Sequence, residues 1–248
     1  MDGHGCEGNE GMKSHTIKNT EALAAFAQQH RWALSRSNCY GLLALVFRDT
    51  PTPQVLEQLR SPVLAQALGR LGYNPADDLA GDLEAVTERL SEEFTRTFVG
   101  PGAFVSPYAS VNYEGEGQLW GDSTVWIKRF IETTGLFFKD NSGSIPDHIA
   151  IELELMQRLT AHEAQLWASR SSGASRNKKD IDEQLRQCLE VQQRFLGEHL
   201  CKWAPRFCER IIKTCTSLFY REMANLTKSI LASNIKEVPA ALRVLSVD

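Results

Sequence analysis

The strongest constraint on the fold of this 248-residue chain is that nearly every long segment repeats its apolar residues with the period of a helix. In the segment 83–98 the apolar positions follow the i, i+3, i+4 spacing of a one-sided helix. They are Leu83, Val86, Leu90, Phe94 and Phe98. The segment 147–167 is apolar on more than one side, so we expect a largely buried helix there. No segment shows the alternation typical of strands. The sequence therefore predicts an all-α fold, a multi-helix bundle.

Polar interruptions divide the helical segments. The segment 100–121 combines Gly, Pro, Ser and Asn with several aromatic residues, and loops of this length are usually functional or mobile. The segment 139–145 has the composition of a flexible linker. We expect a disordered N-terminal tail over 1–19, a helical subdomain over 20–138 that carries the aromatic loop 100–121, a hinge over 139–145 and a second helical subdomain over 146–248. Opening of the hinge allows a monomer to become a domain-swapped homodimer.

Charge and hydropathy limit the location and the partners. No apolar run approaches the ~20 residues that cross a bilayer, and the first twenty residues have no apolar core of a secretory signal. We therefore expect a cytoplasmic protein with no integral membrane segment. The range 107–154 contains eight acidic and three basic residues, within a chain of net charge −4. Such a region attracts basic ligands and repels nucleic acid, although charge alone also fits an ordinary solvated face.

The turn Pro146-Asp147-His148 stands at the start of the second buried helix. Proline fixes its own φ and keeps the preceding residue extended, so the helix can begin at Asp147 or His148. Asp147 suits the N-cap, where its carboxylate accepts from first-turn amides. Two interpretations remain open. Asp147 caps the helix and nothing more, or it forms a site with His148 and with Glu152, one turn later on the same face.

Enzyme motifs are incomplete in this chain. His162-Glu163 begins like an HExxH zinc motif, but position 166 is Leu. No GxGxxG, GxxxxGK[ST] or GxSxG motif is present. Cys201, Cys208 and Cys215 recur every seven residues, about 10 Å apart along a helix, which favours core thiols over a zinc site. We therefore expect no enzyme, no metal and no cofactor. A helical metal- or carboxylate-dependent enzyme is the alternative that remains.

Five blocks of the sequence resemble, in order, the TorD/DmsD family of redox-enzyme maturation chaperones. The blocks are Glu93-Phe94 with Phe98-Val99-Gly100-Pro101-Gly102, then Ser106-Pro107-Tyr108-Ala109-Ser110-Val111, then Leu119-Trp120-Gly121-Asp122-Ser123-Thr124, then Pro146-Asp147-His148-Ile149 with Glu152-Leu153 and Met156, and finally His199-Leu200 with Trp203-Ala204-Pro205-Arg206-Phe207 and Phe219-Tyr220. Each block alone is a weak signal, and five in order are specific. The resemblance spans about 40–224.

The resemblance implies an all-helical cytoplasmic chaperone. It would bind the twin-arginine signal peptide, and often the mature portion, of the apo form of a molybdopterin-dependent redox enzyme, assisting cofactor loading and delaying export. Carried over by position, the signal-peptide-binding residues would be Phe98, Pro107, Tyr108, Trp120, Gly121, Asp147 and His148.

Secondary candidates for the peptide site are Asp122 and Glu152. Tyr108 stands where some family members have tryptophan, which leaves the shape of the groove open. Phe98 and Trp120 could equally be core residues. A generic helical interaction scaffold is a further alternative, and it would differ from the chaperone in lacking selectivity for a twin-arginine motif.

Overall fold

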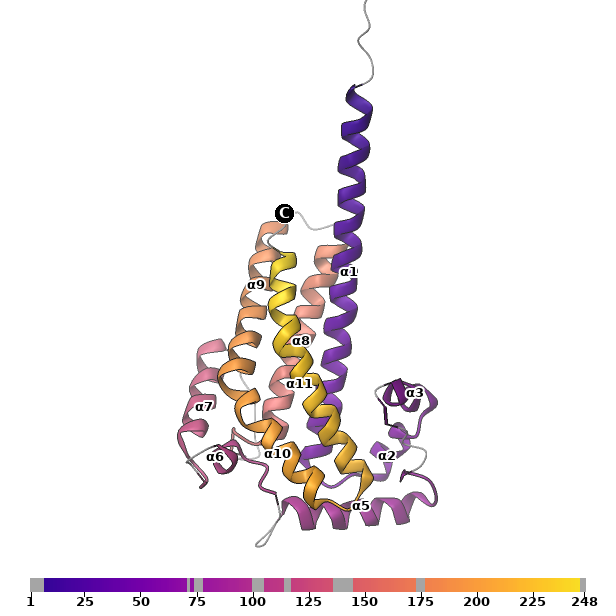
Figure 1. Cartoon of the computed structure of the whole chain (residues 1–248), viewed down its shortest axis with the longest axis vertical. Coiled ribbons are helices and arrows are strands. Elements are labelled where there is room, and N and C mark those ends of the chain that lie inside the picture. The colour runs from indigo at the N-terminus through magenta and orange to yellow at the C-terminus, as the bar shows by residue number, and fades with distance from the viewer. Residues whose placement is uncertain are drawn as a thin grey trace, which may run out of the picture.

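The computed structural model of this chain has an all-α architecture (Figure 1). It describes residues 7–70, 72–73, 78–99, 105–113, 117–135, 145–172 and 177–245. Within these ranges the only β feature is an isolated antiparallel bridge between Tyr108 and His148. The predicted all-α fold class is therefore confirmed.

The long helices form a ring in which each helix packs against the next. They are α1 (Glu7–Arg48), α8 (Ile149–Ser171), α9 (Lys178–Phe195) and α11 (Leu218–Val244). The most extensive contact joins α1 to α8, and α9 and α11 complete the ring. Figure 1 shows them side by side, with the N-terminal part of α1 continuing beyond the end of the bundle. Helix α8 is buried on several faces, as its sequence predicted.

Shorter helices cover the opposite end and one side of this ring. Near the C-terminal end of α1 lie α2 (Pro53–Leu59), α3 (Pro62–Arg70) and α5 (Leu83–Phe98). Helix α5 runs across the bundle axis in Figure 1. The side is covered by α6 (Ala109–Asn112) and α7 (Asp122–Thr134). A π-helical segment, Leu196–Leu200, follows α9 and leads into α10 (Cys201–Thr214).

Helix α5 forms where the apolar period predicted it. Its N-cap is Asp82, whose carboxylate accepts from the backbone N–H of Ala85 at 3.0 Å. The apolar stripe of this helix turns inward and is buried from Val86 to Phe98. The cap satisfies a first-turn amide and the stripe buries its apolar area, so both local and tertiary preferences favour the same helix.

A buried polar cluster crosses the middle of the ring. The guanidinium of Arg36 on α1 pairs with Glu163 on α8 at 2.5 Å and donates at 3.0 Å to both Gln192 on α9 and Asn234 on α11. Trp167 donates its indole N–H to the same carboxylate at 3.1 Å. These side chains are almost fully buried. Removal of one partner would leave an uncompensated buried charge, so the cluster links α1, α8, α9 and α11 by contacts that depend on one another.

Two of the predicted boundaries, the end of the tail and the hinge, can be compared with the described residues. Helix α1 begins at Glu7, so the expected boundary of a disordered tail at residue 19 falls inside a helix. Residues 1–6 lie outside the described ranges, as do residues 136–144, which contain most of the expected hinge. The hinge and the two subdomains remain predictions. Because α1 and α8 pack along each other, the two expected subdomains share one core.

The cysteine stripe occupies the positions expected of core thiols. Cys208 and Cys215 are buried and Cys201 is half-buried, and all three are free thiols. Burial raises the pKa of the Cys208 thiol to about 12, so it stays protonated. In the part of the chain that the structure describes, no helix is long and apolar enough to cross a membrane.

Candidate functional site

The turn Pro146-Asp147-His148 does not start α8 as the sequence predicted. The N-cap is His148, whose Nδ1 accepts from the backbone N–H of Ala150 at 3.1 Å, and the helix begins at Ile149. The prediction that Asp147 caps α8 is therefore wrong. The imidazole takes over the capping role because the Asp147 carboxylate is held elsewhere.

Asp147 is fully buried and joins two other segments. Its Oδ2 accepts from the backbone N–H of Ser110 at 2.8 Å and from the hydroxyl of Thr124 at 3.0 Å. Ser110 lies in the first turn of α6, whose own N-cap, Tyr108, makes no side-chain cap bond. Asp147 therefore supplies an acceptor to the start of α6 and at the same time ties the first turn of α7 to this position.

Backbone bonds hold the same turn against the loop that precedes α6. The N–H of Ala109 donates to the carbonyl of Asp147 at 2.9 Å, and the N–H of Ile149 donates to the carbonyl of Pro107 at 2.8 Å. Between these bonds the rings of Tyr108 and His148 meet edge to face, with centroids 5.1 Å apart. The two segments therefore form one rigid wall that carries Tyr108 and His148 together.

This wall borders a groove of about 640 Å³ between the end of α1, the end of α5 and the segment 105–113. Its apolar lining consists of Phe94, Phe98, Val99, Pro107, Val111 and Leu119. Its polar lining includes Arg48, Asp49, Tyr108 and His148. The groove thus offers apolar and polar surface in about equal measure, which suits a ligand that carries both apolar and hydrogen-bonding groups.

The structure brings four of the predicted site residues to this groove: Phe98, Pro107, Tyr108 and His148. Phe98 is 8% exposed, and its ring packs on Phe94 at 5.0 Å and on Tyr220 at 5.8 Å. It therefore belongs to the core and at the same time lines the groove. The two interpretations of Phe98, core and site, both describe part of its environment.

Trp120 and Gly121 lie next in sequence to the lining residue Leu119, but neither lines the groove itself. Trp120 is 65% exposed, so the interpretation of this residue as core is wrong. Its φ of 66° is left-handed, and it is the one described non-glycine residue with positive φ. Such a conformation is costly for a tryptophan and recurs at functional sites. Gly121 is the N-cap of α7.

The groove's titratable rings are neutral at pH 7. Burial, followed by the nearby positive charge of Arg48, lowers the pKa of His148 to about 4, while Asp147 acts in the opposite direction. Burial and the charge of Asp147 raise the pKa of Tyr108 above its usual range. His148 and Tyr108 therefore offer neutral polar edges beside the apolar floor rather than charges.

Two of the acidic residues of 107–154 that the structure describes are buried and add nothing to an exposed acidic field. Glu152 is fully buried, where its carboxylate contacts His199 Nε2 at 2.6 Å and accepts from the indole N–H of Trp203 at 3.0 Å. Burial raises the pKa of Glu152, whereas His199 and Trp203 lower it. Asp147 is likewise buried. Glu152 is therefore part of the core and does not line the groove that His148 lines, so the structure does not bring this secondary candidate to the site.

Comparison with known proteins identifies the family. The sequence model of the nitrate reductase delta subunit family matches residues 56–209. The chain belongs to this family. The chaperone protein TorD of Aliivibrio salmonicida is 23% identical over 228 residues, which cover 86% of this chain and 96% of that protein. The Tat proofreading chaperone DmsD of Salmonella typhi is 28% identical over 146 residues, which cover 58% and 60% of the two chains.

These relatives confirm the resemblance to the TorD/DmsD family. A third relative, the chaperone protein TorD of Vibrio atlanticus, is 27% identical and covers 77% of this chain and 88% of that protein. All three are named as chaperones rather than enzymes, which supports a chaperone of redox-enzyme maturation over the enzyme alternative. Among the described residues, no three His, Cys, Asp or Glu side chains gather as metal ligands do.

Two residues that the sequence prediction missed, Arg48 and Asp49, line the groove at the end of α1. The only local signal was a charged pair just before the Thr-Pro residues that end the helix. Their proximity to His148 comes from the packing of α1 on α8, a contact that joins residues about a hundred positions apart and that no local pattern predicts.

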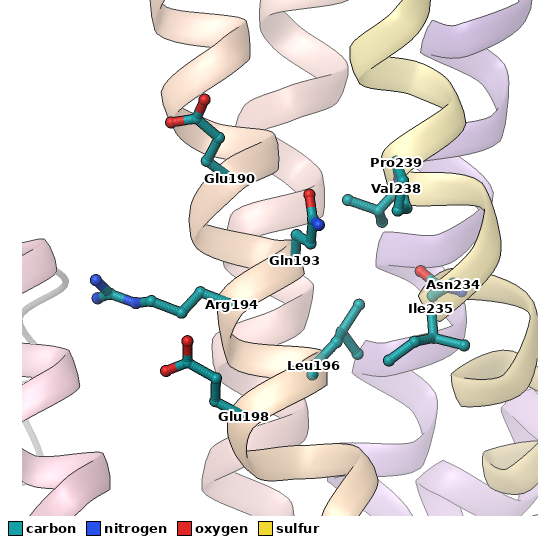
Figure 2. A pocket seen from close by; sticks show the side chains of 10 residues that line it. Glu190, Gln193, Arg194, Leu196, Glu198, Asn234, Ile235, Val238 and Pro239 are labelled. Atoms are coloured by element: carbon teal, nitrogen blue, oxygen red, sulfur yellow. The ribbon is translucent and has the colours of Figure 1, made fainter.

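A second pocket of this chain lies between α9 and α11 and has a volume of about 520 Å³ (Figure 2). In Figure 2, Leu196 from the π-helical segment faces Ile235 and Val238 from α11, whereas Arg194 and Glu198 point away from α11. None of the predicted site residues lines this pocket.

Asp122, a secondary candidate, lies away from the groove. It is exposed at the first turn of α7 and lines a third pocket of about 440 Å³ between α7 and α9. That pocket shares Arg194 and Glu198 with the pocket of Figure 2. The structure therefore separates Asp122 from the residues that Asp147 and His148 bring together.

Proposed function

We propose that this chain is a cytoplasmic chaperone that binds the twin-arginine signal peptide of a molybdenum-cofactor oxidoreductase in the groove of about 640 Å³ beside His148. By occupying the signal, and in part the mature portion, it assists cofactor loading and delays export. The name Tat proofreading chaperone, carried by the relative DmsD, supports this choice of partner.

The observation that carries the proposal is the composition of the groove. A twin-arginine signal joins two cationic side chains to an apolar stretch, so its receptor needs apolar surface next to acceptors for guanidinium. Phe94, Val111 and Leu119 supply apolar lining, and the carboxylate of Asp49 lies in the same groove. Apolar anchors and charge-assisted hydrogen bonds are the contacts that dominate such recognition.

Asp147 supports this site from below. It is buried and contacts Ser110 and Thr124, so it positions the groove wall rather than contacting the peptide. Pro107, Tyr108 and His148 are the predicted residues of the wall that line the groove. The exposed ring of Trp120 stands beside Leu119 in sequence and extends the surface on which an apolar segment can lie.

Calorimetric titration of the full chain with a twin-arginine signal peptide tests the proposal. The reference is the same peptide with both arginines replaced by glutamine. We expect binding of the arginine peptide and at least tenfold weaker binding of the glutamine peptide, since two charge-assisted contacts are lost. Equal affinity for both peptides would instead favour a generic interaction scaffold.

A matched pair of leucines tests the location of the site. Leu119→Ala removes an apolar side chain that lines the groove and is 47% exposed. Leu34→Ala removes the same side chain from α1 at a position outside the groove that is 45% exposed. Only the first substitution should weaken peptide binding, by about fivefold for the apolar area lost. Equal effects of the two substitutions would place the site elsewhere.

A further inference from the structure

A carboxylate next to the groove is already occupied by two arginine side chains of the protein itself. Glu154 on α8 accepts at Oε2 from the guanidinium of Arg48. At Oε1 it accepts from Arg158, with distances of 2.5 Å to Nη2 and 3.2 Å to Nε. Glu154 is therefore placed and oriented to receive guanidinium groups on both of its oxygens.

Arg48 separates this carboxylate from the groove. Arg48 lines the groove, whereas Glu154 does not. Arg48 and His148 line the same groove, and the charge of Arg48 also lowers the pKa of His148. The Arg48 side chain is 48% exposed and that of Glu154 is 23% exposed. A pair this open to water contributes little to stability, so opening it costs little free energy.

A carboxylate that lines the groove itself is not covered in this way. Asp49, the residue after Arg48, is exposed and accepts from the backbone N–H of Thr50 at 2.7 Å through Oδ1. Its Oδ2 has no partner among the described residues. The groove thus holds one open carboxylate, Asp49, while Arg48 occupies a second carboxylate, Glu154, that lies beside the groove.

We propose that Glu154 is a guanidinium-binding residue of the peptide groove and that Arg48 occupies it in the free protein as an internal competitor. An arginine of the incoming peptide displaces Arg48 from Oε2 and takes its place. The inference rests on the proposed function, since the displacing group comes from the twin-arginine peptide. It predicts selectivity for arginine over lysine, because the site is built around planar guanidinium groups.

Substitution of the two partners tests the competition through the sign of the effect. Arg48→Gln removes the competitor, so the twin-arginine peptide should bind about threefold more tightly, within the range of a half-exposed ion pair. Glu154→Gln removes the acceptor, so the peptide should bind about tenfold more weakly. In the double variant the gain from Arg48→Gln should disappear, because the gain requires the Glu154 carboxylate.

Arg89→Gln is the matched control. Arg89 is 46% exposed, pairs with Asp78 and does not line the groove, and its loss changes the net charge by the same amount as Arg48→Gln. Weaker binding by the Arg48→Gln variant, or a gain no larger than that of Arg89→Gln, would overturn the inference. So would a gain that persists in the double variant.

A measurement on the wild-type chain tests displacement of Arg48 without any substitution that could impair folding. The Nε–H resonance of Arg48 in nitrogen-edited spectra should shift on saturation with the twin-arginine peptide and stay unchanged with the glutamine peptide. If the twin-arginine peptide binds tightly and the Arg48 resonance does not shift, displacement of Arg48 is refuted. The proposed function would remain intact. Failure of the wild-type chain to prefer the arginine peptide would refute the proposed function itself.

Discussion

Replacement of Asp147 offers the sharpest test of how the groove wall is held. Asp147 accepts from Ser110 N–H at 2.8 Å and from the Thr124 hydroxyl at 3.0 Å in a fully buried position. Its Oδ1 has no partner among the described residues. A carboxylate that only capped its own helix would be replaced by asparagine at almost no cost, because Asn and Asp cap equally well.

The structure predicts a larger effect. Each hydrogen bond to a charged acceptor contributes about 1.5–3 kcal/mol to stability. Removal of the buried Oδ1, which has no partner among the described residues, recovers a desolvation penalty of about 1–3 kcal/mol. Asp147→Ala should therefore lower the free energy of unfolding by about 2–4 kcal/mol. Asp147→Asn keeps two weaker bonds but places an amide donor where Oδ1 was, so the loss should be about 1–2 kcal/mol.

Urea unfolding at pH 7 measures these losses, with Asp82→Asn as the matched control. Asp82 is a true N-cap, accepts from Ala85 N–H at 3.0 Å and lies on the surface, so its replacement should change stability by less than about 0.5 kcal/mol. Hydrogen exchange gives a local readout, since the Ser110 amide should exchange faster in the Asp147 variants. If Asp147→Asn matched Asp82→Asn and the Ser110 amide stayed protected, the reasoning would be refuted.

Three further predictions concern the whole fold. The pKa of His148 is about 4 in the folded chain and 6.5 in the unfolded chain, so the unfolded state binds more protons between these two pH values. Stability should therefore fall as pH falls from 6.5 to 4, by about 3 kcal/mol at most, and His148→Asn should remove that part of the pH profile in urea unfolding. Glu163→Ala should cost about 3–5 kcal/mol in the same assay because Arg36 stays buried without its carboxylate, whereas Glu154→Ala, at a half-buried position paired with exposed arginines, should cost under about 1 kcal/mol. A swapped dimer should be seen by size exclusion at high concentration and increase when the linker 139–145 is shortened, and a monomer under all conditions would count against swapping.

Local patterns in the sequence predicted the helices but not the partners of buried polar groups. The apolar period placed α5 and α8 because helix formation depends on neighbours three and four residues away. The Asp147 carboxylate was assigned to the wrong helix because its donors, Ser110 and Thr124, are 37 and 23 residues distant in sequence. The same holds for Glu152, whose contacts to His199 and Trp203 span 47 and 51 residues.

The candidate site was predictable to the extent that family-like blocks coincide with the groove wall. Pro107, Tyr108 and His148 were found in this way and lie together. Arg48 was missed because its contact with Glu154 spans 106 residues and joins helices that no motif connects. Charge counting over 107–154 also treated every carboxylate as exposed, whereas two of those that the structure describes, Asp147 and Glu152, are buried.

The buried pair of Arg36 and Glu163 has a consequence for mixtures of chains, because the linker 139–145 lies between the two residues in sequence. In a dimer exchanged at this linker, Arg36 of one copy would meet Glu163 of the other. Co-refolding an Arg36→Ala chain with a Glu163→Ala chain would then restore one complete pair, which neither chain can form alone. A mixture of the two variants that is more stable than either variant alone would thus show that the chains exchange segments.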